Sequence, residues 1–100
     1  MALQIRNKEG FIEVYGSLKS QNIDILRSYL ETEFKSCDYL TLTLDKICGI
    51  DLPSAVELEW ICKKASRMNQ VLSIIGMKNI PVYQIMKTAK SDYILSHDRI

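Results

Sequence analysis

The chain has 100 residues, with 13 basic and 12 acidic side chains and a formal net charge of +1. This length suits one domain with a single core, and the balanced charge gives no electrostatic basis for binding nucleic acid or an anionic membrane. No apolar run approaches the roughly 18–20 residues that span a bilayer, and the charged N-terminal residues do not form a signal peptide. We therefore expect a single cytoplasmic domain over residues 1–100, with no membrane insertion.

The N-terminal part predicts a hairpin followed by a helix. Residues 2–6 and 11–18 have the composition of two strands, separated by a short polar turn that ends in Gly. Ser20 or Asn22 then caps a helix over residues 23–35, because apolar side chains recur there at helical spacing.

The central part predicts a strand, a helix and a second strand. In residues 40–44, Leu alternates with Thr, which indicates a strand with one buried face. A connection through Gly49 leads to Asp51, a good helix cap, and Pro53 falls in the first turn, where its missing N–H costs nothing. A second strand over residues 71–76 completes a βαβ unit. Its strand-to-helix elbow presents backbone N–H groups and the positive end of a helix dipole.

The C-terminal part predicts one more helix and a short strand. Asn79 caps the helix, with Pro81 in its first turn. Residues 93–95 suit a last edge strand, and residues 96–100 suit a frayed tail. The sequence shows no internal repeat, linker or low-complexity segment.

Two apolar lines run along the predicted central helix. The core-facing stripe consists of Ala55, Leu58, Ile61, Cys62, Ala65 and Met68. Leu52, Val56 and Trp60 form a second line on the opposite side. This second line is bordered by Lys63, Lys64 and Arg67. A Trp among basic side chains on an outer face is typical of a protein interface; the alternative is that Trp60 packs on a neighbouring helix.

A family resemblance follows from the order of these elements. The strand over residues 11–18 ends in Gly-Ser-Leu, the elbow carries Asp51, the helix after it bears Leu58, and residues 88–94 close the pattern. Together they resemble the STAS domain, a family named for sulfate transporters and antagonists of anti-sigma factors, over roughly residues 10–95. The resemblance implies an α/β fold: a single-domain βα superhelix with a mixed, mostly parallel sheet and helices mainly on one face.

The sequence departs from this family at the elbow. In members that are phosphorylated, the Asp is followed by Ser-Ser-Gly, and the first Ser accepts phosphate from a partner kinase. Here Asp51 is followed by Leu52, Pro53 and Ser54, so the acceptor position has no hydroxyl. Many members also have an acidic residue where this chain has Thr43. Ser54 is two positions further on, about 200° around the helix, and phosphorylation there remains an alternative.

Few residues have the spacing of a catalytic or metal site. We interpret Asp51 as a helix cap, because no second carboxylate or His stands at a useful spacing for acid–base catalysis. Asn would fill this capping role about as well. Cys37, Cys48 and Cys62 lack the spacing of a zinc or redox site, and His97 falls in the predicted tail. We expect no enzyme, no metal and no cofactor.

The sequence therefore predicts a stand-alone STAS-like module that regulates a cytoplasmic partner by binding it. The resemblance implies either an anti-sigma factor of the serine kinase-like ATPase type, or the ATPase of an ABC-type transport system. The expected partner-binding residues are Asp51, Leu52, Ser54, Val56, Trp60, Lys63, Lys64 and Arg67. Two alternatives remain: a switch phosphorylated at Ser54, and a module that binds a small anion or other ligand at the elbow.

Overall fold

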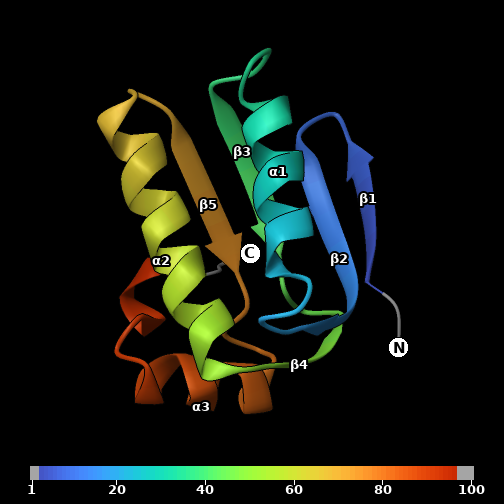
Figure 1. Cartoon of the computed structure of the whole chain (residues 1–100), viewed down its shortest axis with the longest axis vertical. Coiled ribbons are helices and arrows are strands. Elements are labelled where there is room, and N and C mark those ends of the chain that lie inside the picture. Colours follow the sequence, from blue (N-terminus) through green and yellow to red (C-terminus); the bar gives the residue numbers. More distant parts are fainter. Residues whose placement is uncertain (1–2, 97–100) are drawn as a thin grey trace.

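The computed structural model, shown in Figure 1, describes residues 3–96 of the chain. Its strands are β1 (Gln4–Lys8), β2 (Phe11–Leu18), β3 (Tyr39–Thr43), β4 (Ile47–Ile50) and β5 (Val71–Ile75). Its helices are α1 (Ile23–Glu33), α2 (Leu52–Arg67), α3 (Ile80–Thr88) and the short 3₁₀-helix η1 (Asp92–Ile94).

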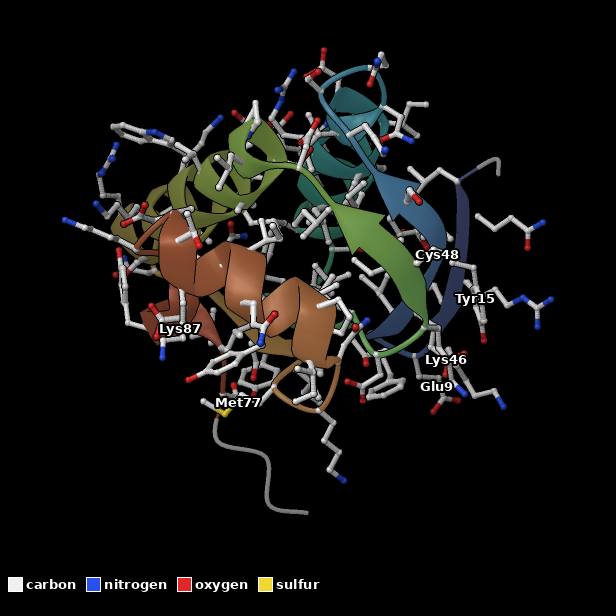
Figure 2. All side chains as sticks on the ribbon, turned by 90° about the horizontal axis from the view of Figure 1, so that it is seen from below. Glu9, Tyr15, Lys46, Cys48, Met77 and Lys87 are labelled. Atoms are coloured by element: carbon white, nitrogen blue, oxygen red, sulfur yellow. The ribbon has the colours of Figure 1, made fainter. Side chains whose placement is uncertain are left out.

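The strands form one mixed sheet in the order β1-β2-β3-β5. β1 and β2 are antiparallel, whereas β2, β3 and β5 run parallel to one another. Helices α1 and α2 lie side by side over one face of this sheet, and α3 lies across its lower end (Figure 1). Seen from below, α3 and β4 are nearest the viewer and close that end (Figure 2). The predicted mostly parallel sheet, with helices mainly on one face, is confirmed.

The alternation of residues along the strands follows from this one-sided cover. On β2, Ile12 and Val14 are fully buried beneath the helices, as is Leu42 on β3. Residues of the opposite parity face away from the helices, and among them Tyr39 is 58% exposed and Val71 is 51% exposed. A sheet with one solvated face alternates in this way, whereas strands covered on both sides are apolar throughout.

Strand β2 changes its pairing partner at Gly16. Its first part pairs with β3 and its last part with β4, both in parallel, and the register shifts between Gly16 and Ser17. Gly16 has a φ of 97°, a conformation that L-residues rarely adopt. Gly16 is opposite Ile47 and Ser17 is opposite Gly49, so the extra residue of this bulge is Cys48 on β4. Gly16 lies where β2 passes from one partner strand to the other.

Two strand predictions were wrong. Strand β4 (Ile47–Ile50) lies in the segment that the sequence predicted as a connection through Gly49, and four residues are too few to show alternation clearly. Residues 93–95 were predicted as an edge strand, but η1 occupies most of them, and only Leu95 forms an isolated bridge with Ile74. Hydrogen bonds within the turn replace the expected strand pairing there.

Three smaller differences concern the ends of elements. The first strand covers Gln4–Lys8 and not residues 2–6, of which residue 2 lies outside the described part. The first helix ends at Glu33, two residues before the predicted end at residue 35. Met68 was placed in the core stripe of α2, yet it is 61% exposed, because the helix ends at Arg67 and Met68 is its C-cap.

Candidate functional site

The N-terminus of α2 is held by both carboxylate oxygens of Asp51. Its Oδ1 accepts the backbone N–H of Ser54 at 3.0 Å, which is the helix-capping bond that the sequence predicted. Its Oδ2 accepts the backbone N–H of Ser20 at 2.9 Å, from the loop between β2 and α1. Asp51 therefore joins two segments far apart in the sequence, in addition to capping its own helix.

These contacts also set the charge state of Asp51. Partial burial by itself would raise the pKa of this carboxyl, but donors of Ser54 and Ser20, together with nearby Lys19, outweigh it and hold the pKa below its usual value. Asp51 is therefore ionised at neutral pH and acts as a hydrogen-bond acceptor. A general acid would need the opposite shift.

The next three residues show which hydroxyl a partner could reach. Leu52, at the position that the resemblance to STAS domains assigns to the phosphate acceptor, is 45% exposed, and Pro53 is also exposed. Ser54 is completely buried, and its hydroxyl has no hydrogen-bond partner among the described residues. Because a buried hydroxyl is not accessible to a kinase or a partner, Ser54 does not lie on the surface to which the sequence assigned it.

Large apolar side chains line the outer face of α2, and we call Leu52, Val56 and Trp60 the α2 crest. Val56 is 39% exposed and Trp60 is 55% exposed, so the predicted separation of this line from the core stripe is confirmed. The ammonium group of Lys63 lies 5.6 Å from the centre of the Trp60 ring, within range of a cation–π interaction. Lys63 also pairs with Glu59 at 3.5 Å. These contacts hold an aromatic side chain at the surface, among charges.

Lys64 and Arg67, the other two predicted basic residues, differ in whether they form an ion pair. Lys64 reaches across to α1 and pairs with Glu31 at 3.3 Å. Arg67, in the last turn of α2, is exposed and forms no ion pair with any residue in the described range 3–96. Lys63, Lys64 and Arg67 thus all lie on the exposed side of α2. Of these three, only Arg67 makes no ion pair within the described residues, so its guanidinium group can pair with an acidic group of a partner.

A groove between α1 and α2 was not predicted from the sequence. It has a volume of about 690 Å³, and its lining includes Trp60 of the crest. We call this feature the α1–α2 groove; its lining residues are Arg27, Leu30, Glu31, Phe34, Lys35, Glu57, Trp60, Ile61, Lys64, Ala65, Met68 and Gln70. Periodicity identifies the inner and outer faces of each helix, but the spacing between two helices is a tertiary property that no local pattern encodes.

The cysteines are separated in the fold. Cys37 and Cys48 are exposed, and Figure 2 shows Cys48 on β4. Burial, with a smaller contribution from Glu59, raises the pKa of the Cys62 thiol to about 11. Within residues 3–96, no three side chains of the metal-binding types lie together as a site. No helix in this range has the length and apolar character needed to cross a membrane.

Comparisons with known proteins identify the fold. No protein-family model and no curated protein sequence matches the chain. Among solved structures, the anti-sigma factor antagonist SpoIIAA in its unphosphorylated form aligns with a TM-score of 0.70 and 11% identity, covering 95% of this chain and 86% of SpoIIAA. An uncharacterised protein from Shewanella loihica PV-4, described as having a SpoIIAA-like fold, aligns with a TM-score of 0.49 and 16% identity over 75% of this chain and 66% of its own. The predicted STAS-like fold is confirmed.

Proposed function

We propose that this domain is a non-catalytic interaction module that regulates a cytoplasmic protein partner by binding it through the α2 crest. The observation that carries the proposal is the exposure of three large apolar side chains in one line on α2, with Trp60 at 55%. Water-exposed apolar surface of this kind is stabilised by covering it, and Trp and Arg most often anchor interfaces. The SpoIIAA-like fold supports the same function class.

The proposed partner class is an anti-sigma factor of the serine kinase-like ATPase type. SpoIIAA, which shares the fold, is described as an antagonist of an anti-sigma factor. In this chain the acceptor position is Leu52, which has no hydroxyl, and Ser54 is buried. We therefore propose that the domain binds its partner constitutively, and that phosphorylation at the N-terminus of α2 does not change its affinity for that partner.

The test compares two aromatic side chains of similar exposure. Trp60→Ala removes the proposed anchor of the α2 crest. Tyr39→Ala removes an aromatic side chain from the solvated face of the sheet, where Tyr39 is 58% exposed. Each variant and the wild type would be titrated with the protein that co-purifies with the tagged chain. Trp60→Ala should weaken binding by about 2 kcal/mol or more, roughly thirtyfold in Kd, and Tyr39→Ala should not weaken it.

Denaturant melts of the same variants separate binding from folding. Because Trp60 is more than half exposed, its truncation should change the free energy of unfolding by less than about 1 kcal/mol. Unchanged partner affinity in a folded Trp60→Ala variant would contradict the proposal. So would a loss of about 3–5 kcal/mol of stability, which is the expected cost of removing a core aromatic residue.

A second test addresses the absence of a phosphate switch. The wild type would be incubated with an anti-sigma kinase and ATP, and its intact mass would then be measured. We expect no added phosphoryl group, since Leu52 replaces the acceptor and the Ser54 hydroxyl is buried. Stoichiometric phosphorylation that maps to Ser54 would show that the first turn of α2 opens to the kinase.

A further inference from the structure

The α1–α2 groove has an apolar floor and an unusual exposed end. Leu30, Ile61 and Ala65 form the floor and are almost completely buried. At the end where both helices finish, Phe34 is half-buried and Met68 is 61% exposed. The groove therefore has buried apolar side chains at its floor and exposed ones at its end. An occupant could insert its own apolar side chains against both.

The acidic side chains that line the groove are paired, whereas two cations at its exposed end are not paired with any of the described residues. Both acidic residues of its lining already have partners: Glu57 pairs with Arg27 at 3.0 Å, and Glu31 pairs with Lys64 at 3.3 Å. Lys35, in the lining, makes no ion pair within the described part of the chain, and the same is true of Arg67 beside Met68. Two cations without partners thus remain at the apolar end, and they complement an acidic occupant.

The walls of the groove favour a helical occupant over an extended one. Both walls are α-helices (Figure 1), whose backbone hydrogen bonds are internal, so they offer no edge with which a strand could pair. An incoming helix satisfies its own backbone and needs only side-chain contacts. The lining runs from Arg27 of α1 to Lys35, two residues beyond the end of that helix, and from Glu57 of α2 to its C-cap Met68. At 1.5 Å per residue these stretches correspond to about 12–16 Å. That length accommodates two to three helical turns.

We infer that the α1–α2 groove docks an amphipathic helix of the partner, with apolar anchors at helical spacing and acidic residues that reach Lys35 and Arg67. The inference rests on the proposed function, because Trp60 belongs both to the α2 crest and to the lining of the groove. It adds the chemistry of the segment that binds: acidic on its flanks and apolar along one face. A carboxylate of that helix would also compete with Glu31 for Lys64.

The probe is a synthetic peptide of about 14 residues, or four helical turns, with Leu at helical spacing and Glu at the flanking positions. A second peptide carries Lys in place of each Glu, and neither contains Trp. Trp60 is the only Trp of the chain, so its emission reports occupation of the groove directly. The acidic peptide should change this emission saturably, with an affinity that falls as salt rises, and the basic peptide should not bind.

Charge-reversed variants test the two cations. Lys35→Glu combined with Arg67→Glu should weaken binding of the acidic peptide by about tenfold or more. The control combines Lys46→Glu with Lys87→Glu, two exposed lysines at the opposite end of the molecule (Figure 2), and changes net charge by the same amount. The control should bind the acidic peptide like the wild type. All four substituted positions are exposed, so folding should be retained.

Three results would overturn the inference: no saturable binding of the acidic peptide, equal binding of the two peptides, or equal weakening by the variant and its control. If one of these occurs while Trp60→Ala still weakens partner binding, the groove inference fails and the α2 crest stands. If the partner ignores the crest and the peptide nevertheless binds as described, the proposed function fails and the groove stands as a docking site.

Discussion

Helices α2 and α3 begin with nearly the same residues and use the first of them differently. Residues 51–53 are Asp-Leu-Pro and residues 79–81 are Asn-Ile-Pro, so each helix has a short polar residue at its N-cap and Pro in its first turn. The aliphatic second residue is exposed in both, at 45% for Leu52 and 55% for Ile80. Locally, the two helix starts are almost interchangeable.

The side chains at the two N-caps have opposite hydrogen-bonding roles. Asp51 only accepts, from Ser54 of its own helix and from Ser20. Asn79 makes no capping bond; its Nδ2 donates to the carbonyl oxygens of Leu44 at 2.9 Å and Ile47 at 3.0 Å. Asn79 thereby holds the turn between β3 and β4, which is more than 30 residues away in the sequence.

A local pattern therefore determines where a helix begins, but not what its cap residue contacts. That contact depends on what the topology places nearby. Beside α2 it places an N–H group, which needs an acceptor, and beside α3 it places two carbonyl groups, which need a donor. The chain has a carboxylate at the first position and an amide at the second, as each environment requires.

The largest effect is expected at Asn79. Asn79→Asp replaces a donor with a carboxylate facing two carbonyl oxygens, and should lower the free energy of unfolding by about 3 kcal/mol or more. Asn79→Ala should cost less, about 1–3 kcal/mol, because it removes the two hydrogen bonds to the carbonyls without repelling them. Urea melts would measure both. Asn69→Asp, at an exposed position with φ of 60°, is the matched control and should be close to neutral.

Asp51 is expected to have the next largest effect. Asp51→Ala loses both hydrogen bonds and should cost about 2 kcal/mol. Asp51→Asn should cost about 1 kcal/mol, because its amide oxygen can accept only one of the two N–H groups while its NH₂ group faces the other. If Asp51→Asn proved as stable as the wild type, the bond to Ser20 would contribute nothing.

The prediction for Asp51→Asn corrects an expectation from the sequence. Spacing alone identified Asp51 as a cap, and Asn caps a helix about as well as Asp does. The second acceptor role was hidden, because Ser20 lies 31 residues away and only the packing of the β2–α1 loop brings it close. The order of elements and the two faces of α2 were predictable because both follow from local periodicity. Strand β4 and the α1–α2 groove were not, since both arise from tertiary contacts.

The pH dependence of stability should also distinguish the two caps. Because the pKa of Asp51 is lowered by folding, its contribution is fully present above the unfolded value, about 3.9, and is lost as pH falls through the folded value. The stability gap between wild type and Asp51→Asn should therefore narrow below about pH 4. The gap between wild type and Asn79→Ala should stay constant, because an amide does not titrate. Melts at several pH values would compare the two gaps; a constant gap for Asp51→Asn would contradict the prediction.

The smallest effects on stability are expected at the two aliphatic neighbours. Leu52→Ala and Ile80→Ala each remove exposed surface, and each should change the free energy of unfolding by less than about 1 kcal/mol. Their effects on partner affinity should differ, since only Leu52 belongs to the α2 crest. Titration of the co-purified partner should show weaker binding for Leu52→Ala alone. Equal affinities would remove Leu52 from the proposed surface.

The positive φ of Gly16 limits which sequences can adopt this fold. A positive φ at that position excludes β-branched and bulky side chains, whatever space surrounds them. In a library randomised at position 16, functional clones should be nearly all Gly, with Asn the most tolerable exception. Position 49, where an added Cβ would meet nothing within 4 Å, should accept many residues. Gly16 and Gly49 lie in strands that pair with each other, yet the range of residues tolerated at the two positions should differ sharply.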